Sequence, residues 1–211
     1  MLVGLLNEEG VRQVLESALR AAQPFRPYRS DVVYVTEVVQ PCVRRAYFER
    51  LHPQSPSVAT VVGEYLHTLL EEGLRALGLR TEVGLALNLG DFKLVGRADA
   101  VLEGEDGDVE DVIEIKTVGK LPGEPLETHV AQLQVYMELL EAPAGTLLYL
   151  NRNTGGVKLF SVRPNPTALE LAVMNARELW EALQDYVPPP PHRGAWCALC
   201  PHRRRCAKAY N

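Results

Sequence analysis

The segment Val112-Ile-Glu-Ile-Lys116 alternates apolar and charged side chains, and it decides how the rest of the sequence is interpreted. On a β-strand, side chains two positions apart project from the same face. Glu114 and Lys116 would therefore share one face while the two isoleucines enter the core. Asp99, in the preceding strand-like segment, can reach the same place from the other arm of a hairpin. Two carboxylates and a lysine at one point indicate metal-assisted phosphodiester chemistry.

Strand-like alternation surrounds this segment, and helical periodicity flanks it on both sides. Residues 81–116 predict a meander of three or four strands, with turns at residues 88–91 and 104–107. A strand over residues 145–150 and a hairpin into residues 157–162 follow. The predicted helices cover residues 8–22, 36–51 (continuing through Pro41), 58–77 with Gly78 as its cap, 127–141 and 166–186. This order predicts an α/β fold with a mixed central sheet flanked by helices.

Composition indicates a globular protein. The chain has 211 residues, 46% of them hydrophobic, which is enough for one full core. The sequence has no apolar run of membrane-spanning length and no signal peptide, so we expect a cytoplasmic protein without a membrane partner. The net charge of −5 argues against a uniformly basic surface, but the clusters Arg44-Arg45 and Arg203–Arg205 could contact phosphates locally.

Three further side chains join the acidic residues as candidates. His67 lies one helical turn after Gly63, so both would share one helix face. Gln132 and Tyr136 have the same spacing on a later predicted helix. Oxygen ligands with one imidazole suit Mn²⁺ or Mg²⁺, and the imidazole favours manganese. We therefore expect the cation ligands to be His67, Asp99 and Glu114.

The four cysteines form a second candidate site. Cys197, Cys200 and Cys206 lie in a short tail behind the spacer Pro188–Pro191, and Cys42 is the remaining thiol. A disulfide framework does not suit a cytoplasmic protein, whereas a bound metal would order such a tail. The spacing fits a four-cysteine iron–sulfur cluster, or a zinc site completed by His192 or His202.

The order of these motifs resembles that of the RecB-like nucleases of the PD-(D/E)xK superfamily. The resemblance covers Gly63-x3-His67, Asp99 within Gly96–Val101, Glu114-Ile-Lys116 and Gln132-x3-Tyr136. Ala98 stands where the superfamily name has proline, and Glu114 replaces an aspartate. The resemblance implies a restriction-endonuclease-like core in which Asp99, Glu114, Lys116, Gln132 and Tyr136 are catalytic. Lys116 would position the attacking water or stabilise the transition state, and the last two residues would order the site.

One cysteine before the nuclease motifs and three after them resemble the CRISPR-associated exonucleases of the fourth Cas family. This implies an iron–sulfur cluster, of the 4Fe-4S type, held by Cys42, Cys197, Cys200 and Cys206. One nuclease domain would then span residues 1–211, with a helical part (1–57), a core (58–187) and a cluster-binding tail (188–211).

The implied function is metal-dependent DNA exonuclease activity on single strands or overhanging ends, which trims spacer precursors for the CRISPR integrase. A stand-alone RecB-like repair or recombination nuclease is one alternative. A non-catalytic module that holds DNA ends or a protein partner is another, although such a module has no need of carboxylates that repel phosphate.

Overall fold

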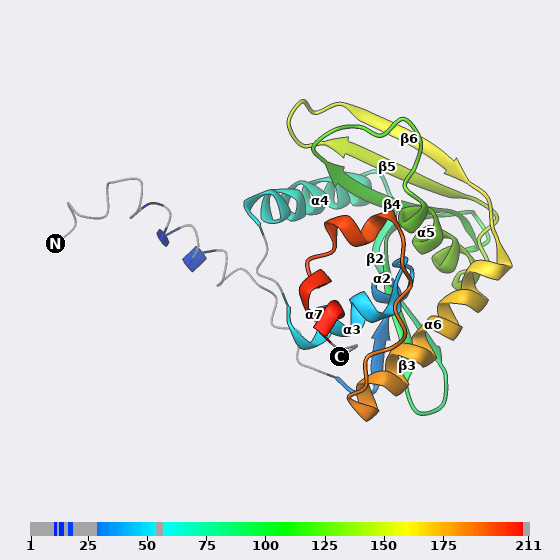
Figure 1. The fold of residues 1–211 in the computed structure, drawn as a ribbon. Coiled ribbons are helices and arrows are strands. Elements are labelled where there is room, and N and C mark those ends of the chain that lie inside the picture. Colours follow the sequence, from blue (N-terminus) through cyan, green and yellow to red (C-terminus); the bar gives the residue numbers. More distant parts are fainter. Residues whose placement is uncertain (1–10, 12, 15–16, 19–28, 54–56, 209–211) are drawn as a thin grey trace.

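A mixed β-sheet forms the centre of the protein (Figure 1). The computed structural model describes residues 11, 13–14, 17–18, 29–53 and 57–208. Within that part, the six strands are β1 (Val32–Tyr34), β2 (Arg80–Asn88), β3 (Lys93–Glu103), β4 (Val109–Val118), β5 (Gly145–Asn151) and β6 (Val157–Val162). Their order is β1-β3-β4-β5-β6, and β2 pairs with β3. The predicted α/β class with a mixed sheet is confirmed.

Two different strands, β1 and β4, pair with separate parts of the same edge of β3. Along one edge β3 pairs with β2 in an antiparallel register that runs from Arg80–Val101 to Asn88–Lys93. On the other edge, β1 pairs in parallel with the first residues of β3, and β4 pairs antiparallel with residues 100–103. The backbone between these two partners has no strand neighbour on this edge.

The helices surround this sheet. They are α2 (Val35–Val38), α3 (Val43–Leu51), α4 (Val58–Ala76), α5 (Glu127–Leu139), α6 (Pro166–Asp185) and α7 (Arg203–Lys208), with a short 3₁₀ helix, η2 (Ala195–Leu199). Thr117 of β4 donates its hydroxyl to a carbonyl of α4, whereas the preceding residue, Lys116, bonds to α5. Because successive strand residues face opposite ways, α4 and α5 cover opposite faces of β4.

Helix α4 begins and ends where the sequence predicts. The Ser57 side chain accepts a hydrogen bond from the Thr60 backbone N–H at 3.1 Å, which satisfies one of the free donors of the first turn. Gly78 follows the last turn with a φ of 95°, a conformation that glycine adopts at low cost. The predicted strands of residues 81–116, 145–150 and 157–162 and the helices near residues 127–141 and 166–186 are likewise confirmed.

Two elements differ from the expectation. The single helix predicted over residues 36–51 is wrong, because residues 39–42 separate α2 from α3. Pro41 has no backbone N–H and its ring clashes with the preceding turn, so a helix cannot continue through it without distortion. Strand β1 was not predicted, because three residues are too few for alternation to be visible. The helix predicted over residues 8–22 lies mostly outside the described residues.

The hydrophobic core lies between the sheet, α5 and α6. Leu133, Leu147 and Leu179 are fully buried there, and Trp180 stacks on Phe92 with a centroid separation of 5.2 Å. No helix in the described part of the chain has the length and apolar character needed to cross a membrane.

Candidate functional site

Asp99 lies where β3 and β4 separate. The ladder between these strands ends at the pair Ala100–Ile113. Beyond it, the backbone N–H of Ile115 donates to Asp99 Oδ2 at 2.6 Å, so a carboxylate replaces the missing ladder acceptor. Asp99 is only 4% exposed, and this bond fixes its orientation. Its second oxygen, Oδ1, faces helix α4.

His67 of α4 meets this oxygen together with a second carboxylate. Its Nε2 lies 3.1 Å from Asp99 Oδ1 and 3.2 Å from Glu71 Oε1. Neither contact has hydrogen-bond geometry, so Nε2 and Glu71 Oε1 are buried atoms without a hydrogen-bond partner. The three ligand atoms lie within 4.8 Å of one another. Among the described residues, no other set of three histidine, cysteine, aspartate or glutamate side chains brings its ligand atoms this close together.

These separations fit a small divalent cation. Oxygen ligands lie at about 2.0–2.1 Å from Mg²⁺ in an octahedron, which places neighbouring ligands roughly 3.0 Å apart. The two distances from His67 Nε2, 3.1 and 3.2 Å, are close to this value. The chemistry of the donors, an imidazole with carboxylates, also suits Mn²⁺ or Mg²⁺. The residues present therefore fit the cation that the sequence implies.

Glu114, Lys116, Gln132 and Tyr136 form a hydrogen-bonded network beside this group. Lys116 Nζ donates to Glu114 Oε1 at 2.6 Å and to Gln132 Oε1 at 2.9 Å. Gln132 Nε2 lies 2.7 Å from Glu114 Oε1 and 3.1 Å from the Tyr136 hydroxyl. The other oxygen of Glu114, Oε2, is buried and has no hydrogen-bond partner. One carboxylate oxygen is therefore held by the network while the other remains available.

Tyr136 reaches the site because residue 96 is glycine. A Cβ atom at Gly96 would lie 2.5 Å from Cε1 of the Tyr136 ring, which is closer than real contacts allow. The absent side chain lets the ring of α5 pack directly on the backbone of β3. Gly96 belongs to the segment of β3 that has no strand partner on its second edge.

Burial and neighbouring charges shift the pKa values of Glu114, Glu71 and His67. Burial, together with the charge of Asp99, raises the pKa of Glu114 to about 7, although Lys116 opposes the shift. Burial likewise raises the pKa of Glu71. Burial alone would lower the pKa of His67, but the neighbouring carboxylates of Asp99, Glu71 and Glu114 outweigh it and raise the pKa. The carboxylates thus repel one another, and a bound cation would relieve that repulsion.

The structure brings the sequence-predicted residues to one place with one difference in grouping. His67 and Asp99 meet directly, and Glu114 is a neighbour whose charge acts on both. Glu71 is the residue that sequence reasoning missed. It follows His67 by one turn, as His67 follows Gly63, so extending the same helical spacing would have found it.

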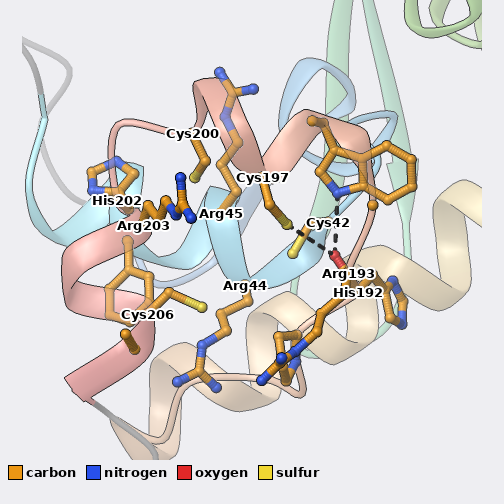
Figure 2. A pocket seen from close by; sticks show the side chains of 15 residues that line it. Cys42, Arg44, Arg45, His192, Arg193, Cys197, Cys200, His202, Arg203 and Cys206 are labelled. Atoms are coloured by element: carbon orange, nitrogen blue, oxygen red, sulfur yellow. Dashed lines mark hydrogen bonds between the residues drawn. The ribbon is translucent and has the colours of Figure 1, made fainter.

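The four cysteines line a separate cavity of about 500 Å³ (Figure 2). All four are free thiols. Cys42 precedes α3 and the others come from the tail, so the structure joins the two segments that the sequence keeps far apart. No three cysteine or histidine ligand atoms of this cavity lie within 4.8 Å of one another. The sulfur ligands of a zinc ion would be about 3.8 Å apart, so the wider arrangement suits a larger group.

The basic clusters differ in their availability for phosphate. Arg44 is only 3% exposed and donates from Nη1 to the Pro189 carbonyl at 2.7 Å, so it ties α3 to the proline spacer. Arg45 pairs with Glu49 at 2.7 Å. The expectation that Arg44 contacts phosphates is therefore wrong, because its side chain is buried. Residues 203–205 are exposed, and their role as phosphate contacts stays a prediction.

Comparison with known proteins identifies the family of this chain. The family model of the PD-(D/E)XK nuclease superfamily matches residues 7–207. The chain belongs to the PD-(D/E)XK nuclease superfamily. Within this superfamily a divalent cation serves the reaction, and the group of His67, Glu71 and Asp99 provides a carboxylate and imidazole site for one.

Individual relatives of this PD-(D/E)XK chain are similar over different lengths. The CRISPR-associated exonuclease Cas4 of Saccharolobus solfataricus is 35% identical over 130 residues, which are 57% of this chain and 63% of that protein. The match thus spans less than two thirds of that relative. The crystal structure of SSO0001 has a TM-score of 0.68 at 27% identity over 93% of this chain and 96% of that one. The alkaline exonuclease of Laribacter hongkongensis shares the fold, with a TM-score of 0.53 and 17% identity. The match covers 91% of this chain and 98% of that one. The resemblance to Cas4 exonucleases is confirmed.

The network around Gln132 can be tested by stability. We expect Gln132→Ala to lower the free energy of unfolding by roughly 1–3 kcal/mol, because it leaves buried polar atoms of its neighbours unpaired. Denaturant unfolding measures this change. Gln134→Ala on the same helix is the control, since Gln134 bonds only to an exposed carbonyl, and about 0.5 kcal/mol or less is expected. Equal losses for the two variants would contradict the network.

Proposed function

We propose that the protein is a metal-dependent DNA exonuclease whose cation is held by His67, Asp99 and Glu114. The observation that carries the proposal is the set of buried ligand atoms without hydrogen-bond partners. His67 Nε2 and Glu114 Oε2 are of this kind, and Asp99 Oδ1 lies beside the first. Buried polar atoms normally have partners, so such a set indicates a bound group. The Cas4 relative is an exonuclease, and this supports the type of cleavage.

The residues of the chain divide the work between them. The Ile115 N–H holds Asp99 in place, and Gln132 with Lys116 holds one oxygen of Glu114. The cation, when bound, would supply a water of lowered pKa and would polarise the scissile phosphate. Lys116, held by its two hydrogen bonds, would place its positive charge near the attacked phosphate and orient the water. Manganese is favoured over magnesium because one ligand is an imidazole.

Cleavage assays test the site and the substrate together. With Mn²⁺, we expect the wild type to degrade end-labelled linear single strands and the overhangs of duplexes, and to leave a closed single-stranded circle intact. Asp99→Asn should lower the rate at least a hundredfold, because the oriented ligand charge is lost. Asp106→Asn, which removes the same charge from an exposed turn, is the control and should retain activity. Activity of Asp99→Asn at the wild-type rate would remove the proposed site, and rapid cleavage of the circle would remove exonuclease specificity.

We also propose that Cys42, Cys197, Cys200 and Cys206 hold a 4Fe-4S cluster. The supporting observations are the shared cavity, the free thiols and a spacing wider than a single zinc ion requires. Four thiolates are the usual ligand set of such a cluster. Since Cys42 and the tail are far apart in sequence, the cluster would act as a cross-link between α3 and the end of the chain.

The colour of the protein purified without oxygen tests the cluster. We expect a brown protein, and Cys42→Ser or Cys197→Ser should lose the visible absorbance and lower the thermal stability. Asp99→Asn should keep the colour, because its side chain lies outside the cavity. A colourless wild type that contains zinc by elemental analysis would show the cluster assignment to be wrong.

We further propose that the exonuclease trims spacer precursors for the CRISPR integrase. The support is similarity to a CRISPR-associated exonuclease over part of the chain. With the integrase and a precursor that carries long overhangs, we expect the wild type to shorten the overhangs before integration. Asp99→Asn should leave them at full length. If the wild type cleaves DNA alone but leaves integrated spacers unchanged in length, the pathway assignment fails while the nuclease proposal stands.

A further inference from the structure

Glu71 is a buried acidic side chain to which the superfamily motifs assign no task. It lies on α4, one turn after His67, and is 5% exposed. Its Oε1 has no hydrogen-bond partner. Arg97 influences its charge, but that arginine is exposed and pairs with Glu82 at 2.8 Å. A buried carboxylate is costly unless a positive charge or a donor compensates it, and the group that faces Glu71 Oε1 is His67 Nε2 at 3.2 Å.

The contact between Glu71 and His67 distinguishes two roles for this carboxylate. A carboxylate that only orients a metal-binding histidine accepts a hydrogen bond from the ring nitrogen that does not face the metal. Glu71 Oε1 instead lies 3.2 Å from Nε2, the same nitrogen that lies 3.1 Å from Asp99 Oδ1. The three atoms therefore face a common point, and the contact lacks hydrogen-bond geometry. This is the arrangement of three ligands around one ion.

Charge balance agrees with this geometry. Asp99, Glu71 and Glu114 bring three negative charges to the site when ionised, and Lys116 brings one positive charge. A divalent cation beside a neutral His67 would make the sum zero. Without a cation, the ionised carboxylates would outnumber the positive charge of Lys116, and protons would have to offset the excess in this largely buried site.

We propose that Glu71 binds the active-site cation directly, as a further ligand beside His67, Asp99 and Glu114. The proposal rests on the proposed metal-dependent function, and it adds a carboxylate that the sequence motifs do not include. Helix α4 then supplies two ligands at positions i and i+4, and strands β3 and β4 supply the other two, Asp99 and Glu114. Because both helical ligands lie on one face of α4, the helix needs no distortion to present them.

Mn²⁺ binding to the cation-free protein, followed by calorimetry or by the loss of free-ion electron paramagnetic resonance signal, tests the proposal without cleavage. We expect Glu71→Gln to weaken Mn²⁺ binding about tenfold or more. Glu72→Gln is the matched control, because Glu72 is the next residue of α4, carries the same charge and is exposed. The control should bind Mn²⁺ as the wild type does. Circular dichroism and thermal melting of Glu71→Asp and Glu71→Gln separate a binding defect from misfolding.

A double-mutant cycle with His67→Ala decides between a direct ligand and an orienting role. If Glu71 binds the ion directly, Glu71→Gln weakens Mn²⁺ binding further in the His67→Ala background. If Glu71 acts only by orienting His67, the second substitution has no further effect, and the proposal is overturned. Unchanged binding by Glu71→Gln in the wild-type background also overturns it. A wild type that binds no Mn²⁺ would instead reject the metal-dependent function itself.

Discussion

The separation of β3 from β4 beyond the Ala100–Ile113 pair is the constraint on which the site depends. A regular ladder would have used the Ile115 N–H to bond the backbone of β3. Because β1 occupies the start of the same β3 edge, the segment between the two partners is left open. A buried N–H without an acceptor is costly, and the carboxylate of Asp99 supplies that acceptor. The same hydrogen bond thus completes the sheet and orients a candidate cation ligand.

Helix α5 converts this opening into a rigid site. The side chain of Gln132 bonds simultaneously to Glu114, Lys116 and Tyr136, so one amide fixes three groups. Its position depends on the close approach of α5 to Gly96, where a larger residue would push the Tyr136 ring away. Candidate ligands and the lysine are therefore placed by regular helices and strands rather than by loops, which limits their movement relative to one another.

The sequence predicts what regular patterns encode, and it fails where a contact between distant segments decides the outcome. Glu114 and Lys116 are recognisable because strand alternation places them on one face. Strand β1 is not recognisable in the sequence, because its three residues form a strand only when β3 offers an open edge. Glu71 was overlooked because a glutamate on a helix surface is common, and its burial is visible only once Asp99 is placed opposite. The convergence of four cysteines could be expected, whereas the burial of Arg44 beside them could not.

The cysteine cavity and the cation site are connected through α3, α2 and strand β1. Cys42 immediately precedes α3, and Arg50 of α3 forms an ion pair with Glu37 of α2. Glu37 also accepts the backbone N–H of Tyr34, the last residue of β1. Helix α6 supports the same unit independently, since Asn175 donates to the Val38 carbonyl at 2.8 Å.

Order in α3 can therefore reach Asp99 by way of β1 and its pairing with the start of β3, and α2 also contacts β3 directly. The tail contributes no atom to the group of His67, Glu71 and Asp99, and its docking reinforces a connection that α6 already makes. Substitution of the cysteines would therefore affect the cation site through lower stability of β1 and β3. The cation ligands themselves would be unchanged. This division separates a thiol-lined cavity from a carboxylate site, and the two sets of donors would favour different metals.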